Sequence, residues 1–149
     1  MKKIIGIVVL TLVVSACGAG KKAAGTAPSP SDDIALGKSE VLKYQSLGNG
    51  VATIDLIFFK NNTFHLRLES IPQPDDAQEP IQISEKGRYS TEGNWNILNF
   101  KNPSFSAASV FDKTYSTPGD FEVLDKQTVK VNTALEGIMI WGIFCEKIE

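Results

Sequence analysis

Alternation of apolar and polar side chains with a period of two residues is the feature that most constrains this fold. Two neighbouring segments show it most clearly, each with its apolar residues on one face: Ala52, Ile54, Leu56 and Phe58, then Phe64, Leu66 and Leu68. This period is typical of half-buried β-strands. Asn61 and Asn62 stand between the segments, and asparagine tolerates the positive φ that a two-residue hairpin turn requires. The sequence therefore predicts a β-hairpin.

The same pattern continues along the chain, with turn residues between the alternating segments. Further strands are predicted over residues 38–46, 81–90, 95–101, 121–124, 128–133 and 138–148. The last run is apolar on both faces, which indicates a strand that is not a solvent-exposed edge. We therefore predict an all-β fold, an antiparallel up-and-down meander of about eight strands that closes into a small barrel and so removes its exposed edges.

The N-terminus has the pattern of an export signal. Met1-Lys2-Lys3 is positively charged, and the apolar run that follows over residues 4–14 is about half the ~20 residues of a membrane-spanning helix. Val14-Ser15-Ala16-Cys17 resembles the lipobox of bacterial lipoproteins, in which the signal is cut before a cysteine that carries acyl chains such as palmitate. That resemblance implies a signal peptide over residues 1–16 and lipid attachment at Cys17. The alternative is an ordinary secretory signal with a fortuitous cysteine.

The residues after Cys17 bear on where such a lipoprotein would reside. By the same resemblance, Gly18 lacks the aspartate that retains many lipoproteins in the inner membrane, so the outer membrane is favoured. Gly18-Ala19-Gly20-Lys21-Lys22 has none of the acidic residues that direct some lipoproteins to the cell surface, so the periplasmic side is favoured. Residues 17–33 are predicted to be the lipidated cysteine and a flexible tether, because residues 18–31 are mostly Gly, Ala, Ser, Thr and Pro. The barrel domain is predicted over residues 34–149.

Two segments resemble a family of small bacterial barrels. They are IDLIFFKNNTFHLRLES (54–70) and EKGRYSTEGNWNILNF (85–100), a strand-turn-strand followed by a G-x-Y and G-x-W pattern. Together with the last strand they are similar to lipocalin-like domains of bacterial lipoproteins, including the barrel of the envelope-stress and copper-homeostasis lipoprotein family. That family carries a C-x-x-C pair near the start of its barrel, and this chain has none, so no copper or redox role is predicted for it.

The composition offers few residues from which a metal site or a catalytic site could be built. The formal charge is −2, and cleavage of a signal that contains Lys2 and Lys3 leaves 13 basic and 17 acidic side chains, a charge of −4, which argues against a nucleic-acid partner. We predict no metal site and no cofactor, because His65 is the only histidine and Cys145 the only cysteine besides Cys17. His65 is expected on the solvated face of its strand, and Cys145 as a small buried apolar residue. Without a nucleophile and base in reach of each other, the chain is predicted not to be an enzyme, with a hydrolase as the minor alternative.

The connection over residues 102–120 is the strongest sequence candidate for function. Loops of this length are functional or disordered, and its aromatic residues argue against disorder. Its side chains either plug the open end of the barrel or form a lid over an apolar cavity. The candidate ligand-binding residues are Trp95, Phe105, Phe111, Tyr115 and Trp141.

Two functions remain open at this stage. The first is a lipid-anchored envelope lipoprotein whose non-catalytic barrel binds a small apolar ligand. The alternative is a protein-interaction module, such as an envelope-stress sensor, assembly factor or periplasmic inhibitor, with a filled barrel. Both place the protein at the outer membrane through lipid on Cys17, with an apolar ligand or an envelope protein as partner. They differ in whether the barrel interior is empty or packed.

Overall fold

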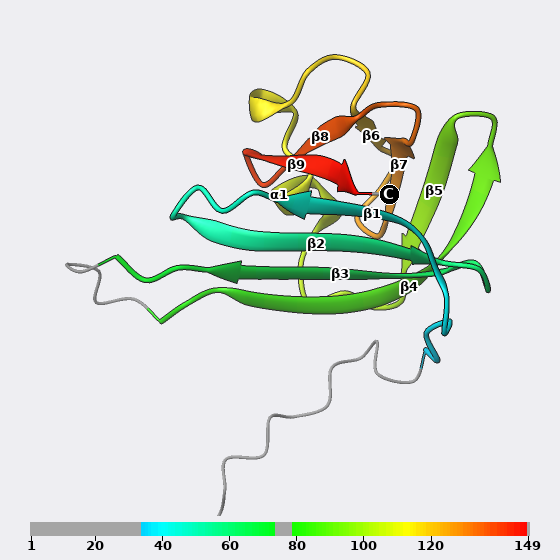
Figure 1. Ribbon diagram of the computed structural model, residues 1–149, viewed down its shortest axis with the longest axis horizontal. Helices are drawn as coiled ribbons and strands as arrows, with labels where there is room; N and C mark the ends of the chain where they lie inside the picture. The colour runs from blue at the N-terminus through cyan, green and yellow to red at the C-terminus, as the bar shows by residue number, and fades with distance from the viewer. Residues whose placement is uncertain (1–33, 74–78, 149) are drawn as a thin grey trace, which may run out of the picture.

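The computed structural model describes residues 34–73 and 79–148 (Figure 1). The predicted signal peptide, Cys17 and tether lie outside these residues. The described residues form nine strands, one short α-helix and one 3₁₀ turn. These elements are β1 (Glu40–Ser46), β2 (Ala52–Phe59), β3 (Thr63–Ser70), β4 (Gln82–Glu92), β5 (Trp95–Phe100), α1 (Ala107–Val110), η1 (Lys113–Tyr115), β6 (Phe121–Val123), β7 (Thr128–Asn132), β8 (Gly137–Ile140) and β9 (Ile143–Ile148).

All nine strands belong to one antiparallel sheet, in the order β6-β7-β5-β4-β3-β2-β1-β9-β8. β1 to β5 are neighbours in chain order, and β9 returns to pair with β1, so the sheet curls into a nearly closed barrel (Figure 1). The predicted all-β antiparallel meander is therefore confirmed. One detail departs from simple sequential pairing, because β5 pairs with β7, and β6 lies outside β7 at one end of the sheet.

The predicted last strand is two strands. Trp141 (φ 51°) and Gly142 (φ 70°) form a tight turn between β8 and β9, and Ile140 pairs with Ile143 across it. A two-residue turn shifts the alternation by one position, so Ile138 and Ile140 in β8 share the interior with Ile143 and Cys145 in β9. The apolar residues on both faces of this run thus reflected a hairpin. The expectation that this run is not an edge was wrong for β8, which ends the sheet, and holds for β9, which lies between β1 and β8.

The β2–β3 hairpin is confirmed, with the predicted faces inward. Phe58 pairs with Phe64, and of the two asparagines in the loop only Asn62 has a positive φ, 58°. All seven apolar residues that were predicted for these two faces are at most 1% exposed. The loop spans residues 60–62, so it is longer than the predicted two-residue turn.

The interior of the barrel is packed with the protein's own side chains. Phe64 contacts Phe100 edge to face at 4.8 Å between ring centroids, and Phe100 contacts Phe105 at 5.1 Å. From the long connection, Val110 (2% exposed) and Phe111 (1%) join the same core. This connection therefore plugs the barrel. Gly87 faces Phe64 so closely that a Cβ there would collide with the phenyl ring, which explains a glycine inside the long strand β4.

A buried carboxylate joins the two ends of the sheet. Asp120, directly before β6, is 4% exposed, and its Oδ2 accepts hydrogen bonds from the backbone N–H of Met139 in β8 and of Thr117, both at 3.2 Å. Its carbonyl oxygen accepts from Asn132 N at 2.9 Å, at the end of β7. Asp120 thus bridges the gap between β6 and β8 that β-ladder hydrogen bonds leave open.

Residues 35–39, among the first that the structure describes, lie against the β2–β3 turn. Gly37 N donates to Thr63 Oγ1 at 3.1 Å, Asn61 Nδ2 donates to Ala35 O at 3.3 Å, and Lys60 N donates to Ser39 O at 3.0 Å. The β1–β2 loop, α1 and the β8–β9 turn lie toward the opposite end of the barrel (Figure 1). The eight residues of β2 separate the two ends by about 26 Å at ~3.3 Å per residue.

Candidate binding cleft at the end of the barrel

The structure brings two of the five predicted ligand-binding residues together. Tyr115 and Trp141 line the same cleft at the end of the barrel that is remote from residue 34. Phe111 is in the core against Phe121, with ring centroids 5.5 Å apart, and Phe105 packs on Phe100. Trp95 lies at the start of β5 with Lys130 Nζ 5.8 Å from its ring centroid, and it does not line the cleft.

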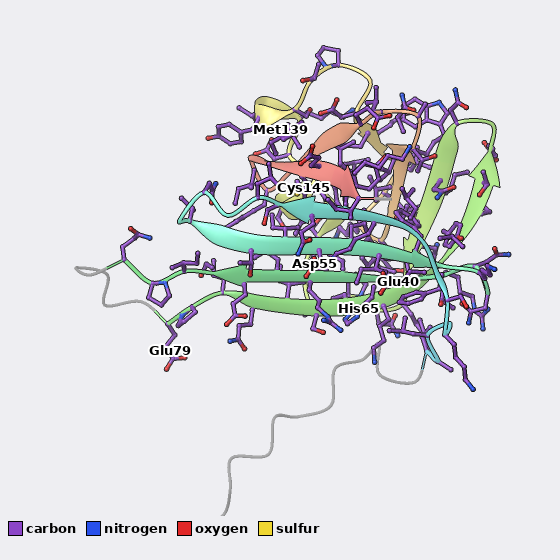
Figure 2. The ribbon with its side chains drawn as sticks, viewed as in Figure 1. Glu40, Asp55, His65, Glu79, Met139 and Cys145 are labelled. Carbon is purple, nitrogen blue, oxygen red and sulfur yellow. The ribbon has the colours of Figure 1, made fainter. Side chains whose placement is uncertain are left out.

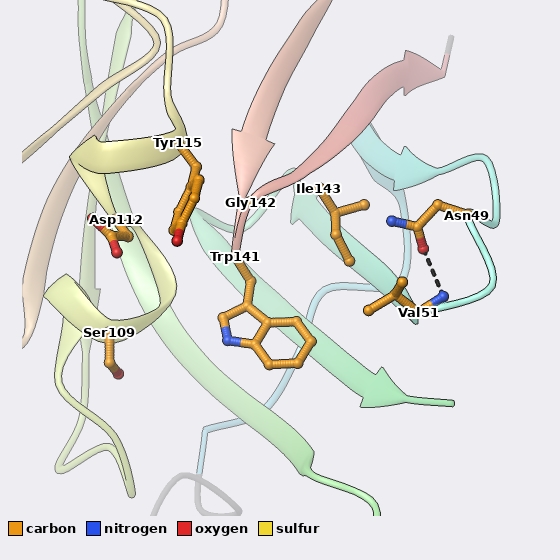
Figure 3. Close-up of a pocket in the computed structure, with 8 residues that line it drawn as sticks. All are labelled: Asn49, Val51, Ser109, Asp112, Tyr115, Trp141, Gly142 and Ile143. Carbon is orange, nitrogen blue, oxygen red and sulfur yellow. Dashed lines mark hydrogen bonds between the residues drawn. The ribbon is translucent and has the colours of Figure 1, made fainter. Parts of the chain in front are cut away.

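The cleft has a volume of about 430 Å³ and two walls (Figure 3). The Trp141 indole projects into it from the β8–β9 turn, between Tyr115, Asp112 and Ser109 on one side and the β1–β2 loop on the other. The loop wall is held by Asn49, whose Oδ1 accepts from Val51 N at 2.9 Å. Val51, Asn49 and Asp112 are cleft residues that the sequence analysis missed. Asn49 and Asp112 left the same signal, a turn-forming Asn or Asp whose side chain accepts the backbone N–H two residues ahead.

Trp141 occupies a backbone conformation that a bulky residue rarely adopts. Its φ of 51° lies in the left-handed region, where glycine and asparagine are favoured. Two contacts hold it there: Trp141 N donates to Val110 O at 2.6 Å, and the Tyr115 ring packs on Gly142, 3.5 Å from where a Cβ would stand. Strain of this kind costs about 1–3 kcal/mol and collects at functional positions. A tryptophan in this backbone conformation therefore favours a binding role for this turn.

A second, smaller hollow of about 200 Å³ continues the apolar surface beyond the cleft. The two hollows share Val51 and Trp141. Apolar side chains along this surface are unusually accessible, with Val51 51% exposed, Ile71 39%, Ile81 49% and Tyr115 63%. Together they form an elongated apolar surface across one end of the molecule.

The structure also brings together a pair that the sequence analysis missed, His65 and Ser84. His65 Nε2 lies 2.9 Å from Ser84 Oγ on the outer face of β3 and β4. His65 is 4% exposed, so the expectation of a solvated histidine was wrong, although it does point away from the barrel interior. The register of β3 and β4 explains the pair. Arg67 is directly opposite Ser84, and His65, two residues before Arg67 on the same face of β3, is diagonal to Ser84.

The hydrogen-bond direction at His65 is opposite to that of a catalytic base. Arg67 Nε donates to His65 Nδ1 at 3.3 Å. A guanidinium can only donate, so in the neutral ring Nδ1 accepts and the proton resides on Nε2. Nε2 then donates to Ser84 Oγ, whereas activation of a serine requires Nε2 to accept the hydroxyl proton.

Cys145 is confirmed as a buried apolar residue. It is fully buried on β9 (Figure 2), and burial, with a smaller effect from the Asp55 charge, raises the pKa of its thiol to about 12. A thiol that stays protonated is a poor nucleophile. Within residues 34–73 and 79–148, no three His, Cys, Asp or Glu side chains gather as a metal site.

Comparisons with protein-family models, with curated proteins and with solved structures gave no match to this chain. What is established is the class that the fold defines, a small antiparallel nearly closed β-barrel. In the part of the chain that the structure describes, no helix has the length and apolar character needed to cross a membrane.

Proposed function

We propose that this protein is a lipid-anchored bacterial envelope lipoprotein with a lipocalin-like barrel that binds a partner and does not catalyse a reaction. Acyl chains on Cys17 would hold it at the outer membrane, on the periplasmic side, as the lipobox and the residues after it indicate. Two acyl chains anchor stably, whereas one binds a membrane only marginally. The hydrogen bond from Arg67 to His65 Nδ1 and the buried thiol of Cys145 support a non-catalytic role.

The observation that carries the binding role is Trp141, held in a strained turn with its indole in an open cleft. Phe111 and Val110 fill the barrel interior, which directs the ligand to this cleft. Residues 35–37 lie at the end of the barrel opposite the cleft, so a domain tethered through its N-terminus can present the cleft away from the membrane.

The shape of the surface favours a segment of a partner protein as the ligand. Its two hollows meet at Val51 and Trp141, so an extended segment could cover both. Exposed apolar surface of this kind marks interaction sites on soluble domains. A small apolar molecule is the second candidate, because about 430 Å³ is within the ~300–1,000 Å³ of small-molecule sites.

Site-specific cross-linking tests the partner. A photoreactive residue at Tyr115 should give a discrete protein adduct in intact cell envelopes, and one at Phe144, an aromatic residue 53% exposed on β9 outside the cleft, should not. Trp141→Asn should abolish the adduct, because asparagine accepts the φ of the turn but removes the indole. Its free energy of unfolding should change by no more than about 1 kcal/mol. Equal adducts from both positions, or an adduct that survives Trp141→Asn, would reject the cleft as the binding site.

Fluorescence separates the two ligand candidates. Trp95→Phe leaves Trp141 as the only tryptophan, and hence a reporter for the cleft. We expect its emission to stay constant when fatty acids, isoprenoids or small aromatic compounds are added. A saturable change with one of them would establish the small-molecule candidate instead.

The membrane anchor has its own test. Cells given an alkynyl palmitate should label the wild-type protein, and Cys17→Ser should remove the label. An unlabelled wild-type protein would reject the anchor and leave the cleft untouched.

A further inference from the structure

The cleft and its neighbouring hollow are acidic as well as apolar. Among the described residues that line them, the ionised side chains are Asp112 and Glu79, and none is a lysine or arginine. Lys113 follows Asp112 in the chain but does not line either hollow. Among the described residues that line the two hollows, every formal charge is therefore negative.

Asp112 is held in place beside the aromatic residues. Its Oδ1 accepts from Thr114 N at 2.8 Å, at the start of η1, and the figure shows the carboxylate on the same wall as Tyr115 (Figure 3). The Thr114 backbone hydrogen bond lowers the pKa of Asp112, so the carboxylate is ionised at neutral pH. The Thr114 side chain also hydrogen-bonds this carboxylate. A carboxylate has about four lone-pair sites, so Asp112 can accept from a further donor.

We infer that this cleft selects a segment that carries a positively charged side chain next to apolar ones, with the cation between the Asp112 carboxylate and the Tyr115 and Trp141 rings. This rests on the proposed function, and it names the chemistry of the partner. Aromatic faces attract cations through their quadrupole, tryptophan most strongly, and a carboxylate adds a charge-assisted hydrogen bond. The apolar residues of the segment would lie on Val51 and Ile81.

Three capped pentapeptides test the inference: leucine alternating with lysine, with glutamine or with glutamate. Binding is followed by Trp141 fluorescence in the full-length Trp95→Phe background at low salt. The lysine peptide should bind about 3- to 5-fold more tightly than the glutamine peptide, which is the scale of an exposed ion pair with a cation–π contact. The glutamate peptide should bind most weakly, and added salt should reduce these differences.

A matched pair of variants locates the charge. Asp112 and Asp125 both accept a backbone N–H two residues ahead, from Thr114 at 2.8 Å and from Gln127 at 2.7 Å, but only Asp112 lines the cleft. Asp112→Asn should remove most of the preference for lysine, and Asp125→Asn should keep it. Equal binding of the lysine and glutamine peptides to wild-type protein would overturn the inference and leave the proposed binding role intact. If none of the peptides binds, the proposed segment-binding role fails together with the inference.

Discussion

At the scale of single residues, burial favours the protonated form of two side chains, Tyr44 and Cys145. Tyr44 is fully buried, and its hydroxyl donates to Leu135 O at 3.0 Å. Burial, with a smaller effect from the Glu136 charge, raises its pKa from 10.0 to about 12. Cys145, on the neighbouring strand β9, has its pKa raised from 9.0 to about 12. In both cases the folded state favours the protonated form.

The protein should therefore lose stability in alkali. A group whose pKa is raised on folding stabilises fully below its unfolded pKa, so this stabilisation should be lost as pH rises from about 9 through about 12. For Tyr44 the loss should be about 1–3 kcal/mol. Urea unfolding at successive pH values measures it. Tyr44→Phe should be less stable at pH 8, because the bond to Leu135 is lost, but its stability should fall less steeply between pH 10 and 12. Equal slopes for both proteins would contradict the assignment to Tyr44.

At the scale of elements, α1 and the residues beside it act as a plug. Phe111, the residue after α1, is 1% exposed and packs edge to face on Phe121. Tyr115, in the next turn of the same connection, is 63% exposed and lines the cleft. One connection thus fills the barrel with one aromatic ring and offers another to a ligand. This answers the question of plug or lid in favour of the plug for Phe111.

Truncation of the two aromatic residues should separate these roles. Phe111→Ala should lower the free energy of unfolding by about 3–5 kcal/mol, since it leaves a cavity in the core. Tyr115→Ala, the matched control, removes an exposed ring and its contact with Gly142, so it should change the free energy of unfolding by at most about 1 kcal/mol but weaken binding in the cleft. Urea denaturation measures the first effect and Trp141 fluorescence the second. A loss of less than about 1 kcal/mol in Phe111→Ala would contradict its place in the core.

At the scale of the whole molecule, barrel closure depends on side chains as well as on strands. β6 and β8 are the two ends of the sheet, and the Asp120 carboxylate receives N–H groups from β8 and from the loop before β6. The carboxylate is buried, so loss of its oxygens would leave these two donors without an acceptor.

Asp120→Ala should therefore destabilise the barrel at its seam. We expect a loss of about 2–4 kcal/mol, and faster hydrogen exchange at the amide of Met139. Asp120→Asn should lose less, because its carbonyl oxygen can still accept. Asp125→Ala, which removes an exposed turn carboxylate, should cost at most about 1 kcal/mol. If Met139 exchanges at the same rate in Asp120→Ala as in the wild type, the carboxylate does not hold the seam.

Local patterns in the sequence determined much of this protein. Alternation with a period of two fixed the strands and inward faces of β2 and β3, because each residue's face depends only on its neighbours in the chain. The same reasoning predicted β8 and β9 as one strand. The turn between them begins at Trp141, and a tryptophan at its first position does not indicate a turn as a glycine or asparagine would. Tyr115 was predicted as a binding residue from its place in the long connection. Trp141, which was predicted within the last strand, was named as an aromatic residue near a possible cavity.

Only the tertiary structure decided which residues meet. The cleft joins the β1–β2 loop, η1 and the β8–β9 turn, so Val51 and Asp112 became site residues through segments far apart in the chain. The burial of His65, its pairing with Ser84 and the bridge at Asp120 depend likewise on strand register and barrel closure. The alternation of a sequence states which way a side chain points along its own strand. It does not state what lies opposite, because strand pairing and closure bring together residues that no local pattern relates.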